Sequence, residues 1–259
     1  MSFAFRSLIR RFRIVLPFFL TIVFSVLAAL PSHAFTVGYF ILEPHAMVVD
    51  GSPTGAAVEY LRDHIAPEMG ETVEFLGPLP FGRMLDEFMD GKLDAVLMLS
   101  RTQMREALFV YPKSPYGIIV SGLLVPRGSL PDPVTSVVQL AGLRIGSTDA
   151  WRPDFLRDPS LDFELVRAPS ATCINFRKYR EGRLDAVYNT DRHALLYRMR
   201  RMPGLKASSV VTVAGTSDGM YTVFSPRLPR HIVSSYEKAL EKVRRHLPYE
   251  QLVDRYMAE

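Results

Sequence analysis

A seven-residue phrase occurs twice in this chain, with the two copies 91 positions apart. The copies are Asp90-Gly-Lys-Leu-Asp-Ala-Val96 and Glu181-Gly-Arg-Leu-Asp-Ala-Val187. Each copy is typical of a helix that ends at a glycine and is followed by a buried strand, because glycine adopts the left-handed conformation of a helix end at little steric cost. The repeated helix–glycine–strand unit predicts two lobes of similar α/β construction, which could close on something held between them.

Residues 1–34 have the pattern of a secretory signal peptide. Four arginines form a positive region, 17 residues with two polar members follow from Ile14 to Leu30, and small residues stand at positions −3 and −1 of a cleavage site after Ala34. The sequence therefore predicts cleavage and export. An uncleaved membrane anchor is the alternative, since 17 apolar residues are the lower limit for spanning a bilayer.

The charge of the chain changes once this segment is set aside. The whole sequence has 31 basic and 27 acidic residues, but residues 1–34 hold four arginines and no acid, so residues 35–259 carry 27 of each. A neutral chain gives no reason to expect a nucleic-acid partner. The single cysteine, Cys173, permits no internal disulfide, and with the export signal it indicates a bacterial periplasmic protein stabilised by packing alone.

Residues 35–259 alternate between strand and helix patterns, which predicts mostly parallel sheets with crossover helices. A stripe at Val58, Leu61, Ile65 and Met69 predicts a helix that stops at Gly70. The other predicted elements are strands at 35–42, 72–76, 93–98, 143–147, 163–166 and 184–188, and helices at 80–89, near 150, at 170–180, through 193–196, from 229 and from 248.

Two apolar extended segments, Gly117–Val125 and Gly219–Phe224, interrupt this alternation. The helices after Pro229 have no sheet of their own to cover, so we expect the chain to return to the first lobe. This predicts a discontinuous first lobe (35–116 with 219–259), a second lobe (117–218) and a two-strand hinge. The alternative is one continuous domain in which both segments are ordinary strands.

From about Phe35 to the C-terminus the chain resembles the type II periplasmic substrate-binding proteins, in particular the polar amino-acid-binding proteins of ABC transporters. The order and spacing of several pieces carry the resemblance, and no single piece does. They are Thr36-Val-Gly-Tyr39, Glu43-Pro44, Asp50-Gly-Ser-Pro-Thr-Gly55, Pro80-Phe-Gly-Arg83, both Gly-x-Leu-Asp-Ala-Val copies, Thr102-Gln-Met-Arg105, Ser114-Pro-Tyr116 and Leu140-Ala-Gly142. The resemblance implies two Rossmann-like lobes joined by a two-strand hinge.

The resemblance makes Arg105 the candidate clamp for a ligand carboxylate, because the family places a Thr-x-x-Arg after the first Gly-x-Leu-Asp-Ala strand. A planar guanidinium can donate two parallel hydrogen bonds to a carboxylate. Two alternatives stay open: Arg105 pairs with Glu106 or another surface acid, or the neighbouring Arg101 takes the role.

An amino-acid pocket also needs an acceptor for the ligand's ammonium group. Family members place an acid shortly after the second Gly-x-Leu-Asp-Ala strand, where this chain has Thr190 at the matching position and Asp191 one position later. Asp191 is therefore either the ammonium acceptor or the cap of the helix that follows.

Further ligand contacts are expected from residues at strand ends and turns, where the family binds its ligand. Aromatic side chains bury apolar area against a ligand, and Ser100 matches the family's pocket hydroxyls. His45 stands where an aromatic residue is usual, which indicates a different ligand. The expected contacts are Tyr39, Phe81, Tyr116, Trp151 and Ser100.

These residues and the resemblance predict a monomeric periplasmic receptor, not an enzyme, that binds a small polar solute, such as an amino acid, and delivers it to an ABC-transporter permease. The six histidines show no metal-ligand spacing, and no nucleotide-binding or serine-hydrolase motif occurs, so no metal and no cofactor are expected. Two alternatives remain. One is an enzyme resembling the cyclohexadienyl dehydratases, with Glu43 as acid; the other is an accessory protein of a periplasmic oxidoreductase that has lost its pocket.

Overall fold

The structure is a computed structural model that describes residues 35–148, 154–168 and 170–258. Its strands are β1 (Phe35–Gly38), β2 (Met47–Val49), β3 (Ser52–Thr54), β4 (Val73–Leu76), β5 (Ala95–Leu99), β6 (Gly117–Pro126), β7 (Arg144–Thr148), β8 (Asp162–Val166), β9 (Ala186–Asn189) and β10 (Ser208–Phe224). Within these residues, eight strands form one sheet in the order β4-β1-β5-β10-β6-β9-β7-β8, while β2 and β3 form a hairpin.

The helices complete the expected alternation. They are α2 (Ala56–Glu59), α3 (Ala66–Met69), α4 (Phe81–Met89), α5 (Gln103–Glu106), α6 (Ala171–Arg180), α7 (Arg192–Arg201), α8 (Arg230–His246) and α9 (Tyr249–Ala258), with a π-helical segment at Tyr60–Ile65 and 3-10 turns at Val137–Leu140 and Asp154–Arg157. The π-helical segment joins α2 and α3 without a break.

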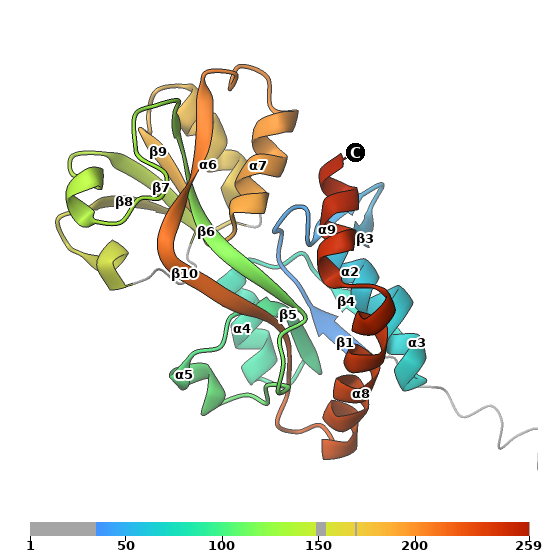
Figure 1. Cartoon of the computed structure of the whole chain (residues 1–259). Helices are drawn as coiled ribbons and strands as arrows, with labels where there is room; N and C mark the ends of the chain where they lie inside the picture. Colours follow the sequence, from blue (N-terminus) through green and yellow to red (C-terminus); the bar gives the residue numbers. More distant parts are fainter. Residues whose placement is uncertain (1–34, 149–153, 169, 259) are drawn as a thin grey trace, which may run out of the picture. The chain divides into compact units, whose positions relative to one another are not determined.

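The sheet has a parallel group at each end and antiparallel strands between them. β1 pairs in parallel with β4 and β5, and β7 pairs in parallel with β8 and β9. Between these groups β10 and β6 run antiparallel to their neighbours and connect the two halves of the sheet (Figure 1). The predicted fold class, α/β with mixed and mostly parallel pairing, is confirmed.

Local sequence explains where the first helices begin and end. Val58, Leu61 and Ile65 are almost wholly buried, as the apolar stripe predicts. The helix stops at Gly70, which has the left-handed φ of 74° that glycine adopts without a clash. Helix α4 begins directly after Pro80, as predicted, because proline lacks the N–H that a helix interior would use.

The repeated phrase makes the same contacts in both halves of the sheet. A Cβ on Gly38 would lie 2.5 Å from the Leu93 side chain, and a Cβ on Gly146 would lie 2.4 Å from Leu184. The aspartate that follows each leucine accepts a hydrogen bond from the backbone of the neighbouring strand: Asp94 from Thr36 N at 2.8 Å, and Asp185 from Arg144 N at 2.9 Å. In each copy, then, the leucine needs a glycine on the adjacent strand and the aspartate fixes that strand's register.

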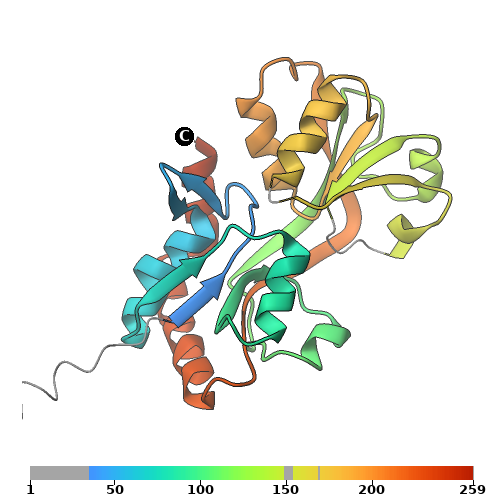
Figure 2. The same ribbon diagram turned by 180° about the vertical axis from the view of Figure 1, so that it is seen from behind.

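The C-terminal helices pack against the first part of the chain, as expected. Tyr236, Leu240 and Tyr249 share a buried cluster with Phe35 and Val37. Helices α8 and α9 lie beside α2 and α3 in both views of the molecule (Figure 1; Figure 2). A separate buried cluster joins β6, β7 and β9, and it includes Leu123, Ile145 and Tyr188. The exact lobe boundaries remain a prediction.

Two elements differ from their predicted extents. Strand β10 has 17 residues, whereas only its last six were expected. Its earlier part mixes serine and threonine with the buried Val210, Val211 and Val213, and it pairs with β6. Strand β1 ends at Gly38 instead of Leu42, because the chain then turns toward the cavity described below. The helix expected near residue 150 lies outside the described residues.

Candidate functional site

Strands β5 and β9, which begin within the two copies of the repeated phrase, end at the same cavity. Their carboxyl ends, Met98–Ser100 at the end of β5 and Asn189–Thr190 at the end of β9, lie on opposite sides of a cavity of about 280 Å³. Ligands of open α/β sheets bind outside the carboxyl ends of the strands, and this volume is near the small end of the range for ligand pockets, roughly 300–1,000 Å³. The internal repeat thus marks the candidate site from both halves of the sheet.

A bulge in β5 shapes one wall of this cavity. Tyr221 pairs with Leu99 and Val223 pairs with Val96, so two steps along β10 correspond to three along β5. Met98, inside this irregularity, has a left-handed φ of 63°, which is uncommon for a residue with a side chain. Bulges next to binding sites re-aim the side chains that follow them, and here Met98, Leu99 and Ser100 all line the cavity.

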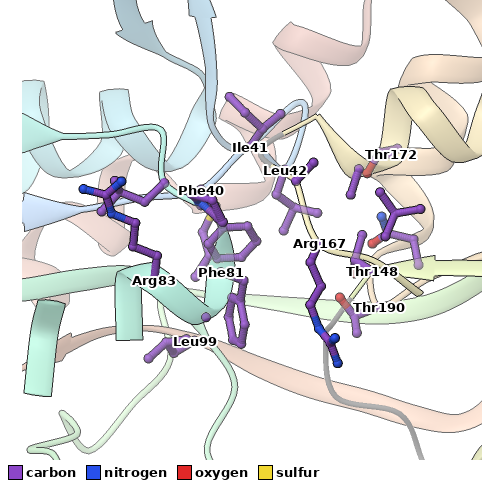
Figure 3. A pocket seen from close by; sticks show the side chains of 18 of the residues that line it. Phe40, Ile41, Leu42, Phe81, Arg83, Leu99, Thr148, Arg167, Thr172 and Thr190 are labelled. Carbon is purple, nitrogen blue, oxygen red and sulfur yellow. The ribbon is translucent and has the colours of Figure 1, made fainter. Parts of the chain in front are cut away.

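The cavity has an apolar side and a hydroxyl-bearing side. Figure 3 shows Phe40, Phe81 and Leu99 opposite Thr148, Thr172 and Thr190. The remaining described lining residues are Ile41, Leu42, Leu79, Pro80, Gly82, Arg83, Met98, Ser100, Arg105, Ile119, Val166, Arg167, Ala168, Ala171 and Asn189. Such a pocket suits a ligand with an apolar part and a few polar groups.

Arg105 is held at the cavity by helix α5. The Thr102 hydroxyl caps this helix by accepting a hydrogen bond from Arg105 N at 3.3 Å. The guanidinium donates to the Ser100 carbonyl at 3.0 Å and lies over the Phe81 ring, 5.5 Å from its centroid. Burial lowers the pKa of Arg105, against the attraction of Tyr111 and Asp218. Among the described residues no carboxylate forms an ion pair with it.

Arg101, the alternative clamp, faces elsewhere. Its guanidinium donates to the Pro112 carbonyl, lies 3.3 Å from the Glu106 carboxylate and stacks on the rings of Tyr111 and Tyr221, 5.2 Å and 4.7 Å from their centroids. It does not line the cavity in the described part of the chain. Arg101, and not Arg105, is therefore the partner of Glu106.

The structure brings three of the expected contacts together. Arg105, Phe81 and Ser100 line the cavity. Tyr39 and Tyr116 do not: Tyr39 is 1% exposed and packs edge-on against Phe75, and Tyr116 packs against the Tyr60 and Tyr249 rings in the core. Both tyrosines bury their rings behind the strands, because an aromatic side chain at a strand end can point to either face. Trp151 lies outside the described residues.

Asp191 caps helix α7 and does not line the cavity. Its carboxylate accepts hydrogen bonds from His193 N at 3.1 Å and Ala194 N at 3.2 Å, and it lies 2.7 Å from the His45 Nε2 atom. The side chain is wholly buried. The structure thus supports the capping alternative, while Thr190, the residue before it, faces the cavity.

Several lining residues were not expected from the sequence. Phe40 and Arg167 follow strands β1 and β8, and Thr148 closes strand β7. The rule that parallel strands present their carboxyl ends to a ligand would have indicated all three. Arg83 also lines the cavity, but its side chain pairs with Glu87 at 2.8 Å and extends away from Thr148 and Thr190 (Figure 3).

Other chemistry finds little support in the described residues. Glu43, the expected acid of the enzyme alternative, forms an ion pair with Arg198 and is not among the lining residues. No group of three or more histidine, cysteine, aspartate or glutamate side chains is placed to hold a metal ion within residues 35–148, 154–168 and 170–258.

Solved structures with a similar fold include amino-acid-binding proteins. No protein-family model matches this sequence, and no curated protein matches it either. An ancestral arginine-binding protein bound to arginine is 21% identical, with a TM-score of 0.71 over 86% of this chain and 97% of that one. The chain has the fold of the type II periplasmic binding proteins.

Two further structures extend this comparison. The amino acid ABC transporter substrate-binding protein AbpA from Streptococcus pneumoniae, bound to L-arginine, is 19% identical, with a TM-score of 0.70 over 87% of this chain and 94% of that one. The GluR0 ligand-binding core in complex with L-glutamate is 18% identical, with a TM-score of 0.71 over 88% of this chain and 98% of that one. At these identities the likeness concerns the fold. In the described part of this binding-protein fold, no helix has the length and apolarity needed to cross a bilayer.

Proposed function

We propose that this protein is a periplasmic receptor that captures a small, carboxylate-bearing solute in the cavity between the two halves of its sheet. The carrying observation is the Arg105 guanidinium, which lines the cavity and has no carboxylate within ion-pair distance among the described residues. Arg105 is half-buried, and a cation that is partly removed from water is stabilised by an anionic partner. A ligand carboxylate would supply that partner through two parallel hydrogen bonds.

The capture mechanism that we propose is closure of two lobes, residues 35–116 with 219–259 and residues 117–218. Three of the buried clusters take all their members from one proposed lobe, and the fourth has two buried members from outside its lobe, Ile119 and Ala194. Strands β6 and β10 would act as the hinge. A ligand that contacts both lobes only when they are closed shifts the population toward the closed form.

Export and delivery complete the proposal. The signal pattern of residues 1–34 supports a periplasmic location, and similar folds belong to transport proteins such as an amino acid ABC transporter substrate-binding protein. We therefore propose that the loaded monomer passes its solute to a membrane permease, without covalent chemistry.

Calorimetric titration of residues 35–259 with carboxylates tests this function. Arg105→Ala should weaken the binding of any carboxylate ligand by about 30-fold or more, because truncating one partner of a buried charge pair costs about 2–5 kcal/mol. Arg101→Ala is the matched control, since Arg101 lies four residues earlier, before the cap of α5, and pairs with Glu106. Equal losses in both variants, or none in Arg105→Ala, would contradict the proposal.

A further inference from the structure

The acid that could receive a ligand's ammonium group is already occupied inside the protein. Both oxygens of the Asp191 carboxylate have partners: Oδ1 accepts from His193 N at 3.1 Å, and Oδ2 accepts from Ala194 N at 3.2 Å and lies 2.7 Å from His45 Nε2. The side chain has no exposed surface. A ligand ammonium could reach this carboxylate only by displacing the helix cap or the imidazole.

His45 is itself fixed from its other side. Its Nδ1 atom lies 2.5 Å from the Tyr249 hydroxyl, and the two rings stack with their centroids 5.8 Å apart. His45 is only 2% exposed. The imidazole thus occupies a position between two buried partners, and neither His45 nor Asp191 is among the described residues that line the cavity.

The described residues of the cavity, within 35–148, 154–168 and 170–258, offer the ligand's amine no other acidic acceptor. Among its described lining residues are three arginines and no aspartate or glutamate. Asp218, the acid that acts electrostatically on Arg105, is half-buried on β10 and does not line the cavity. A protonated amine placed beside a guanidinium without a carboxylate would lose its hydration and meet a like charge, and both effects oppose binding.

The neutral polar groups favour a different substituent in the amine's place. Ser100, Thr148, Thr172 and Thr190 bring hydroxyls to the cavity, which can donate hydrogen bonds to a carbonyl oxygen or accept them from a hydroxyl. The apolar wall of Phe40, Phe81 and Leu99 suits a hydrocarbon side chain (Figure 3). The lining therefore matches an acid with an oxo or hydroxyl group and an apolar tail.

We propose that the ligand is an organic acid without an ammonium group, of the 2-oxo or 2-hydroxy carboxylate class, because Asp191 is occupied by the α7 cap and by His45 and does not face the cavity. This inference rests on the proposed function, since it assumes that Arg105 receives the carboxylate. It makes the site selective against the amino acids that related folds bind.

Matched ligand pairs test this selectivity. Residues 35–259 would be titrated calorimetrically with phenylpyruvate and phenylalanine, pyruvate and alanine, and oxaloacetate and aspartate. We expect at least one oxo acid to bind, and to bind at least tenfold more tightly than its amino acid. Tighter binding of the amino acid in each pair that binds would overturn the inference but leave the receptor function standing. Failure of every acid to bind would overturn both.

A gain-of-function variant provides an independent readout. Thr190→Asp would put a carboxylate on the cavity wall without touching Asp191, and Thr190→Asn is the control with the same shape and no charge. The ratio of oxo-acid to amino-acid affinity should fall by at least tenfold in Thr190→Asp and stay within threefold of wild type in Thr190→Asn. An unchanged ratio in Thr190→Asp would contradict the idea that a missing acceptor sets the selectivity.

Discussion

The imidazole of His45 lies 2.7 Å from the carboxylate of Asp191, although the two residues are 146 positions apart in the sequence. His45 follows β1 and Asp191 follows β9, so this contact joins the loops beyond two strands from different halves of the sheet. Both side chains are almost completely buried. The pair therefore connects the halves of the molecule next to the candidate ligand cavity.

Removing this imidazole should destabilise the protein strongly. His45→Ala would remove one of the two imidazoles that lie beside the buried Asp191 carboxylate, and breaking a buried pair in this way costs about 3–5 kcal/mol. Urea denaturation followed by circular dichroism measures the loss. His231→Ala is the control, because His231 is exposed on α8 and should change stability by less than about 0.5 kcal/mol. Similar midpoints for the two variants would contradict the assignment.

The same aspartate should control the titration of His193. The hydrogen bond with Asp191 raises the pKa of His193 from its ordinary value of 6.5, and the Asp191 carboxylate also attracts the charged imidazole. NMR titration should show this raised pKa in the wild type and a lower one in Asp191→Asn, which keeps an oxygen to cap α7. An unchanged pKa in Asp191→Asn would contradict the coupling.

This shift has a defined effect on stability. Because the folded-state pKa is raised, the contribution of His193 is fully present below the unfolded-state value near 6.5 and is lost as the pH rises through the folded-state value. The His193 side chain is 39% exposed, so the effect should be small. The unfolding free energy of Asp191→Asn should change less than that of the wild type over this interval, as denaturation at a series of pH values would show.

Capping of α5 should matter more for ligand binding than for stability. Thr102→Ala removes the hydroxyl that accepts from Arg105 N, and loss of such a cap costs about 1 kcal/mol. It would also release the turn that aims the Arg105 guanidinium at the cavity, so we expect a several-fold loss of carboxylate affinity. Thr102→Ser keeps the hydroxyl and should bind normally. Calorimetry on the two variants would decide, and equal affinity would contradict a positioning role for the cap.

The close contact between Gly38 and Leu93 predicts coupled substitutions. Gly38→Ala would place a Cβ 2.5 Å from the Leu93 side chain and destabilise the protein by about 1–3 kcal/mol through overpacking. In Gly38→Ala/Leu93→Ala the clash disappears, so the double variant should be more stable than the sum of the single effects predicts. Additive denaturation energies would show that the two residues do not compete for space.

The sequence predicted local structure better than it predicted the partners of individual side chains. Helix periodicity and glycine placed α3, α4 and both repeat strands close to their observed bounds, because these signals depend on neighbours three or four residues away. The extent of β10 was missed although its first half holds the buried Val210, Val211 and Val213, because the sequence alone did not show that this segment pairs with β6.

For the site, the resemblance to the binding-protein family indicated Arg105, Phe81 and Ser100 correctly as cavity residues. It could not exclude Arg101, Tyr39 or Tyr116 as ligand contacts. Which of Arg101 and Arg105 is left to bind a ligand depends on which of them forms the ion pair with Glu106. Likewise, the histidine that meets Asp191 is far away in the sequence. Spacing alone cannot show contacts made by the folding of distant strands.

The same leucine–glycine contact occurs once in each half of the sheet, so one experiment can be done twice in the same molecule. Gly38 with Leu93 and Gly146 with Leu184 pose the same steric problem in two settings, beside two differently lined walls of one cavity. A substitution made at both places separates what the shared architecture requires from what each wall requires. Any difference between the paired effects would then measure how differently the two halves of the sheet tolerate the same added methyl group.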